Sequence, residues 1–206
     1  MSRTLKVASR IPFIFVLLII AGYLWLFGDF HFPEWETYYG ISYATQVSYY
    51  FFLLVVFLIF SRLRDAPYLR STAPVAGRQF LIGFVVTLVF MMVLYGVGFI
   101  RPEVLPSALL IPMILMQVSV ISPAEELMFR GVVLSYVGII ASAILFVIWH
   151  GVTYGVFTGN SPYMLFVAFV FGLVMGIIAR NKEFGIPTTI GIHACFNLVI
   201  VGALIL

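Results

Sequence analysis

The stretch Pro-Ala-Glu-Glu-Leu-Met-Phe-Arg-Gly at residues 123–131 places two adjacent glutamates and an arginine inside one of the most apolar parts of the chain. The apolar residues Val118–Ile121 precede it, and Val132–Leu134 follow it. Ionisable side chains in such surroundings are costly to bury in a bilayer, and where they occur they usually have a function. The fold has to explain these three charges.

The composition is typical of an integral membrane protein. The chain has 206 residues, of which 63% are hydrophobic and only 9% are charged, and its mean hydropathy is +1.16. A soluble domain carries charge on about a quarter of its residues. The net charge of +3 comes mostly from arginines between the apolar runs, so it indicates orientation in the lipid bilayer, and we expect no nucleic-acid partner.

The apolar runs are continuous over lengths that suit helices and not the alternating pattern of a barrel. We therefore predict an all-α fold, a polytopic transmembrane helix bundle of about seven spans. We expect one integral membrane domain over residues 1–206, with the chemically interesting core at residues 105–206. The predicted spans are Ile11–Gly28, Gln46–Phe60, Gln79–Phe99, Ala108–Leu134, Ile139–Phe157, Tyr163–Ala179 and Ile186–Leu206.

The basic residues gather before the first span and in alternate loops. They are Arg3, Lys6 and Arg10, then Arg62, Arg64, Arg70 and Arg78, then Arg180 and Lys182, whereas Arg101 lies on the opposite side beside Glu103. Positively charged loops favour the cytoplasmic side. The pattern predicts a multi-pass protein with a cytoplasmic N-terminus and an external C-terminus, in the plasma membrane if the source is a prokaryote.

The charged stretch has two interpretations. In the first, a new helix begins here, because Ser122-Pro123-Ala124-Glu125 fits a capping box with proline in the first turn. The glutamates would then lie in a solvent-exposed first turn on the cytoplasmic side, and His150 would lie about 30 Å away across the bilayer.

In the second interpretation, one helix runs through the charges to Leu134, and Pro123 only kinks it. The chain then turns at residues 135–138. Glu125 lies about ten residues before this turn and His150 about twelve after it, so at 1.5 Å per residue both are roughly 15–18 Å deep. Two antiparallel helices would bring a carboxylate and an imidazole to the same level.

Spacing also separates the charges into roles. Glu126 and Arg130 are four residues apart on one helical face and predict an ion pair, whereas Glu125 is turned about 100° away and remains available. His193 lies about ten residues into the last span, with Asn197 four residues later on the same face. A single buried histidine is more commonly a core residue, and a single asparagine commonly forms a hydrogen bond between helices.

Three motifs resemble those of the CAAX-protease and bacteriocin-processing family of intramembrane proteases, also called the Abi family. The motifs are Glu-Glu-x-x-x-Arg at 125–130, Phe-x-x-x-His at 146–150 and His-x-x-x-Asn at 193–197. Each is weak alone, but three in order on the fourth, fifth and seventh predicted spans are specific. The family includes the eukaryotic prenyl-protein endopeptidase, and the resemblance covers residues 125–197.

The resemblance implies a role for each motif residue. Glu125 would be the general base that polarises a water together with His150, and His193 and Asn197 would hydrogen-bond the oxyanion. Glu126 and Arg130 would support the site, and Phe146 would pack one turn from His150. The family's glutamate mechanism implies no obligatory cofactor. Glu125, His150 and His193 nevertheless form a set of the type that binds catalytic zinc, although the soluble HExxH spacing is absent.

The expected function is that of an intramembrane endopeptidase acting on membrane-associated peptides or protein tails. The substrate itself is not readable from the chain. A non-catalytic binding or immunity protein on the same scaffold would need only the Glu126–Arg130 pair and general packing. A proton-coupled transporter would also use intramembrane glutamate and histidine, but the chain lacks the internal repeat that is common in transporters.

Overall fold

The computed structural model describes residues 37–38, 41–42, 72–100, 114–115, 117–153 and 162–200. The described part is helical apart from two strands of two residues each, β1 (Thr37–Tyr38) and β2 (Ile41–Ser42), which pair antiparallel. The predicted first and second spans, Ile11–Gly28 and Gln46–Phe60, lie outside the described residues. The all-α class holds for the described core, and the number of spans stays a prediction.

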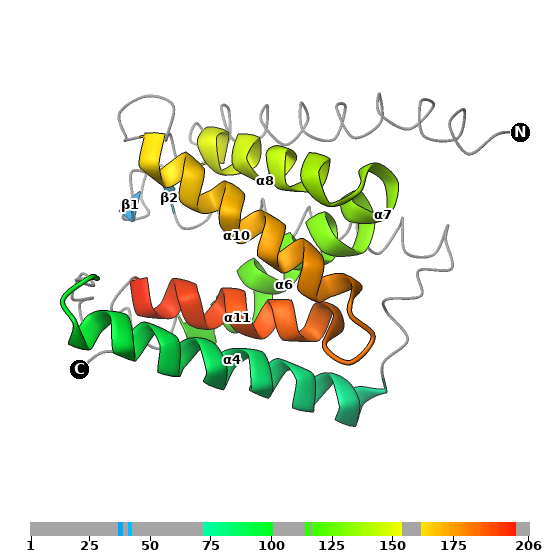
Figure 1. Cartoon of the computed structure of the whole chain (residues 1–206), viewed down its shortest axis with the longest axis horizontal. Helices are drawn as coiled ribbons and strands as arrows, with labels where there is room; N and C mark the ends of the chain where they lie inside the picture. The colour runs from blue at the N-terminus through cyan, green and yellow to red at the C-terminus, as the bar shows by residue number, and fades with distance from the viewer. Residues whose placement is uncertain are drawn as a thin grey trace, which may run out of the picture.

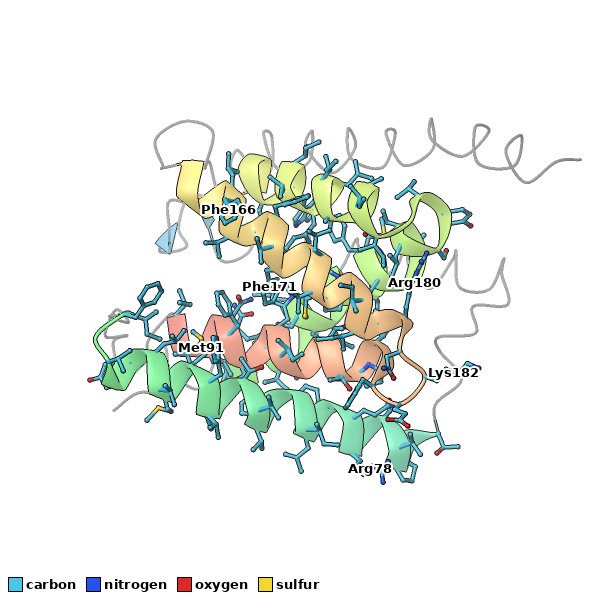
Figure 2. The ribbon with its side chains drawn as sticks, in the orientation of Figure 1. Arg78, Met91, Phe166, Phe171, Arg180 and Lys182 are labelled. Carbon is cyan, nitrogen blue, oxygen red and sulfur yellow. The ribbon has the colours of Figure 1, made fainter. Side chains whose placement is uncertain are left out.

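Four long helices frame the core (Figure 1). They are α4 (Ala73–Gly96), α8 (Ile139–Thr153), α10 (Pro162–Arg180) and α11 (Gly185–Ile200). In Figure 1, α4, α8 and α11 run in one direction and α10 runs back between α8 and α11. These directions are those expected for spans that alternate across a bilayer. Arg78, Arg180 and Lys182 lie toward the same end of the long axis (Figure 2).

Within the described residues, one helical stretch is long and apolar enough to cross a membrane by length and composition, Pro74–Gly96 with 23 residues. Three further apolar helical stretches are shorter, namely Ile139–His150, Leu165–Arg180 and Gly185–Ile200. The third span was predicted to begin at Gln79, but α4 begins at Ala73. Pro74 lies in the first turn of α4, where a missing backbone N–H costs nothing.

The charged stretch lies inside a continuous helical segment, which agrees with the second interpretation of the sequence. This segment consists of the π-helix η2 (Gln117–Ile121), α6 (Ser122–Glu126), the π-helix η3 (Leu127–Val133) and α7 (Leu134–Val137). Ile121 has helical dihedral angles, and no side chain caps α6. The capping-box interpretation is therefore wrong. Gly138, with φ of 85°, ends the segment and starts the turn into α8.

The two π-helices were not predicted. A proline inside an α-helix clashes with the carbonyl group four residues earlier. For Pro123 that carbonyl belongs to Ser119, which lies in the widened turns of η2. Pro123 is thus accommodated without ending the helix. Widened helical turns of this kind occur frequently at functional sites.

Helices α4 and α11 pack closely because glycines face backbone atoms across their interface. A Cβ atom at Gly83 would overlap the carbonyl oxygen of Thr188, and one at Gly191 would overlap that of Phe80. Small residues allow such close approach between helices in membranes. Farther along the same pair, Met91 packs with Cys195 and other apolar side chains. This interface fixes the helix that carries His193.

We expect Gly83→Ala and Gly191→Ala each to destabilise the protein by about 1–3 kcal/mol, the usual cost of overpacking. The measurement is thermal unfolding of the purified protein in detergent. Gly77→Ala is the matched control, since it makes the same change on α4 where nothing lies within 4 Å of the new Cβ atom. Equal melting temperatures for Gly191→Ala and Gly77→Ala would contradict this account of the interface.

Candidate active site

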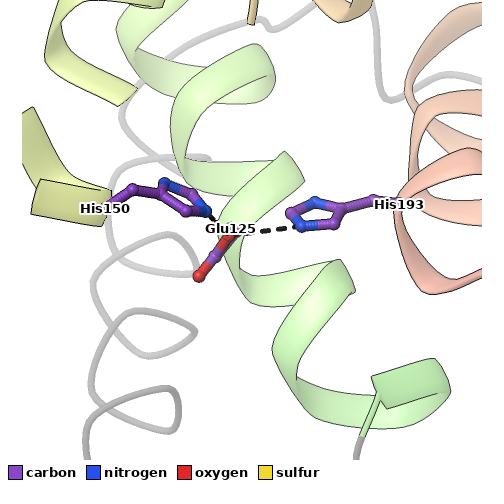
Figure 3. A group of neighbouring side chains, drawn as sticks. All are labelled: Glu125, His150 and His193. Atoms are coloured by element: carbon purple, nitrogen blue, oxygen red, sulfur yellow. Dashed lines mark ion pairs between the residues drawn. The ribbon is translucent and has the colours of Figure 1, made fainter. Parts of the chain in front are cut away.

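Three helices bring one carboxylate and two imidazoles together in the core (Figure 3). Glu125 extends from α6 between His150 of α8 and His193 of α11. The Glu125 Oε2 atom lies 3.7 Å from His150 Nε2 and 3.5 Å from His193 Nε2. One potential ligand atom from each of the three side chains lies within 4.8 Å of the other two. The depth argument from sequence thus places Glu125 and His150 correctly at one level.

Hydrogen bonds on the far side of each ring decide where the imidazole lone pairs point. His193 Nδ1 lies 2.8 Å from Glu126 Oε1, and His150 Nδ1 lies 2.9 Å from the Phe146 carbonyl oxygen. Both partners can only accept, so each Nδ1 carries the hydrogen. In a neutral ring the Nε2 lone pair then faces Glu125. The arrangement favours a proton donor, such as a water molecule, or a cation at the centre.

The predicted ion pair between Glu126 and Arg130 is present, with 3.3 Å between Oε2 and the guanidinium Nε. Both side chains are almost completely buried, at 0% and 1% exposure. The guanidinium also lies over the ring of Phe146, 4.2 Å from its centroid, where a cation–π contact adds stabilisation. Phe146 therefore does more than pack beside His150, because its ring and its carbonyl both contact site residues.

Glu126 has a second contact that the sequence interpretation missed. Its carboxylate was assigned only to Arg130, but it also holds His193, so the ring of His193 lies between the two adjacent glutamates. Two carboxylates and one guanidinium leave one excess negative charge in this buried cluster. An added proton on His193, or a bound cation, would balance it. Buried charges require such compensation.

Two further polar residues reach the site and were not predicted. The Trp149 Nε1–H donates to Glu125 Oε1 at 3.3 Å, and the amide of Asn197 donates to the Gln117 side-chain oxygen at 2.9 Å. Trp149 lies in the middle of the predicted fifth span instead of at a predicted membrane interface, where tryptophan is enriched. Gln117 is an amide within an apolar run. A tryptophan and an amide at such positions are unusual, and the sequence alone could have marked both as candidate site residues.

Aromatic rings close the site on the side of α10. Phe171, labelled near the middle of α10 in Figure 2, has its ring centroid 5.4 Å from that of His193 and 6.2 Å from that of Phe146. His150 is the most accessible of the three central side chains, with 20% of its side chain exposed against 0% for Glu125. Water or substrate would therefore approach beside His150.

The comparison with known protein families matches the part of the chain that carries these residues. Residues 106–199 match the model of a family described as type II CAAX prenyl endopeptidase, Rce1-like. This match supports membership in the CAAX protease family. The matched CAAX protease segment contains all seven residues that the motifs predicted, from Glu125 to Asn197. Family membership indicates a protease that is integral to the membrane. No curated protein and no solved structure matches the chain significantly.

Loss of Glu126 should destabilise the fold through Arg130. Among the described residues no group forms a hydrogen bond of good geometry with the guanidinium, so Glu126→Gln leaves a buried charge without its ionic partner. Breaking a buried pair in this way costs about 3–5 kcal/mol. We expect a lower melting temperature and a lower yield of folded protein in detergent.

The double variant Glu126→Gln with Arg130→Met tests the cause. Methionine fills a similar volume without charge, so the double variant should be more stable than Glu126→Gln alone. If the double variant is as unstable as the single one, the buried charge of Arg130 is not the source of the loss.

Proposed function

We propose that this chain is an intramembrane endopeptidase that hydrolyses peptide bonds of membrane-associated protein or peptide substrates. The observation that carries the proposal is the convergence of the Glu125 carboxylate with the Nε2 atoms of His150 and His193 in a buried site. The family supports the reaction class. The glutamate-type mechanism and the individual roles below are part of the proposal.

Glu125 acts as the general base in this mechanism. A water molecule among the three side chains donates one hydrogen to Glu125 Oε2 and the other to His150 Nε2, whose lone pair faces the centre. Glu125 takes the proton as the water oxygen bonds to the substrate carbonyl carbon. The C–N bond then breaks as Glu125 returns the proton to the leaving nitrogen. The Trp149 N–H holds the other carboxylate oxygen in place.

His193 and Asn197 stabilise the negative charge that develops on the substrate oxygen. His193 already donates its Nδ1 hydrogen to Glu126, so it needs a second hydrogen on Nε2 to serve the oxyanion. The resulting imidazolium would offset the excess negative charge of the cluster. Preorganised donors of this kind commonly make the largest single contribution to transition-state stabilisation.

The same side chains also fit a zinc ion. Glu125, His150 and His193 form a His₂Glu donor set, and each histidine gives its other N–H to a carboxylate or carbonyl, as metal-binding histidines usually do. Bound zinc would act as a Lewis acid and lower the pKa of a ligated water. We retain the metal-free mechanism as the proposal and zinc as its competitor.

Seven spans and a cytoplasmic N-terminus remain part of the proposal. They are supported by the alternating directions of the described helices and by Arg78, Arg180 and Lys182 at one end of the long axis (Figures 1 and 2). The turn at Gly138 and the loop at 181–184 would then face the cytoplasm. Protein tails that reach the membrane from that side are the expected substrates.

The first test is Glu125→Gln, which keeps the shape of the side chain but cannot accept a proton from water. We expect a fall of about 10²–10⁴-fold in kcat, the range for general-base catalysis, with an unchanged melting temperature. The assay follows cleavage of a fluorogenic farnesylated CAAX peptide and of the same peptide without the farnesyl group, in detergent.

Glu183→Gln makes the same chemical change in an exposed loop and serves as the control. Full activity of Glu125→Gln would refute the role of Glu125. If the wild-type chain binds these peptides without cleaving them, the chain is a binding protein on this scaffold.

The second test separates the two mechanisms. Without a required metal, chelation leaves activity in place, and His193→Ala resembles Asn197→Ala, each losing about 10²–10³-fold in kcat because both serve one oxyanion. With zinc, His193→Ala loses the metal and nearly all activity, whereas Asn197→Ala keeps the metal. Elemental analysis of the purified proteins and assays after exhaustive chelation give the answer. Stoichiometric zinc whose removal abolishes turnover, and whose return restores it, would overturn the metal-free mechanism.

A further inference from the structure

Gln117 is a buried amide with no role in the mechanism above. It lies at the start of the π-helix η2, and only 7% of its surface is exposed. Its neighbours along the chain are apolar, so its polar end needs partners inside the protein. Two of these are the Asn197 side-chain amide at 2.9 Å and the Ser122 hydroxyl at 3.5 Å, both of which donate to the Gln117 oxygen.

The contact with Gln117 determines where the oxygen and the NH₂ group of the Asn197 side chain point. An asparagine side chain has an oxygen and an NH₂ group of similar size, and a turn of 180° exchanges them. Because the Gln117 oxygen can only accept, the NH₂ group of Asn197 points toward the segment that carries Glu125. The NH₂ group is planar, so directing one hydrogen to Gln117 also fixes the direction of the second.

We propose that Gln117 is a positioning residue for the reaction. It holds the Asn197 amide in the orientation in which the second N–H serves the oxyanion. This inference rests on the proposed function, in which Asn197 is an oxyanion donor. Donors contribute most when they are aimed before charge develops, since no reorganisation is then required during the reaction.

The position of Gln117 suits this task. Asn197 is only partly buried, and one turn earlier on α11 the ring of His193 is held by Glu126. Gln117 accepts a hydrogen bond that orients the Asn197 amide, just as Glu126 accepts one that orients the His193 ring. Both holding residues lie on the helical segment 117–137, which also contains Glu125. One rigid segment would thus orient the base and both oxyanion donors together.

A purely structural role makes different predictions. A hydrogen bond between helices could simply hold α11 against the segment, as amide groups do in membrane proteins. Removing it would then lower the stability and leave kcat unchanged. A positioning role lowers kcat, has little effect on KM, and acts only through Asn197.

The experiment is a double-mutant cycle on kcat and KM with the peptide substrate that the wild-type protein cleaves. Gln117→Met keeps the length of the side chain and removes the acceptor, and we expect about a tenfold fall in kcat with KM changed less than about twofold. Ser122→Ala, which removes another donor to the same oxygen, is the control and should remain near wild type.

The cycle adds Asn197→Ala and the double variant. If Gln117 acts through Asn197, Gln117→Met costs nothing further once Asn197 is alanine, and the double variant matches Asn197→Ala within about twofold. Independent, multiplying effects would overturn the inference, as would wild-type kcat in Gln117→Met. If Gln117→Met does not fold, Gln117→Asn replaces it. Asparagine keeps the amide but is one CH₂ group shorter, so its oxygen lies farther from Asn197, and the same results would support or overturn the inference.

Failure of the proposed function has a distinct signature. If the wild-type protein cleaves neither peptide, or if Asn197→Ala has wild-type kcat, the assumption about Asn197 fails before Gln117 is considered, and the inference falls with it. If Asn197→Ala loses kcat and Gln117→Met does not, the proposed function stands and only the positioning role of Gln117 is wrong.

Discussion

The carboxylate of Glu126 is the constraint on which the site depends. It is completely buried, and it contacts Arg130 on its own helix and His193 on α11. A charged group in such a place is tolerated only with partners in good geometry. The rotation of α11 relative to the segment 117–137 must therefore satisfy this contact. With His193 held on one ring nitrogen by Glu126, its other nitrogen lies 3.5 Å from Glu125 Oε2.

Local irregularity in one helix and close packing of two others cooperate in this geometry. Pro123 is accommodated by the widened turns of η2, so the charged stretch stays helical and deep in the core. Gly83 and Gly191 let α4 approach α11 until backbone atoms nearly touch. The helix that carries His193 is thereby held from both sides, by charge from one and by van der Waals contact from the other. Such rigidity is what a preorganised site requires.

The sequence alone determined the features that follow from distance along a helix. The four-residue spacing of Glu126 and Arg130 predicted their ion pair, and similar distances from the turn predicted that Glu125 and His150 would share a level. The rise and periodicity of an α-helix do not depend on the surrounding fold. Both relations also survived the widened turns of η2 and η3 in this segment. The segment remained helical through Pro123.

Only the tertiary structure decided the contacts that depend on how each helix is rotated about its axis. The hydrogen bonds from Trp149 to Glu125 and from His193 to Glu126 could not be predicted from spacing along the chain. A small rotation of α8 or α11 about its axis would direct these side chains elsewhere. Gln117 meets Asn197 across 80 residues of chain for the same reason. Rotation is fixed by packing, which is a property of facing surfaces and not of one helix. The sequence thus determined which groups share a depth, and packing decided which of them touch.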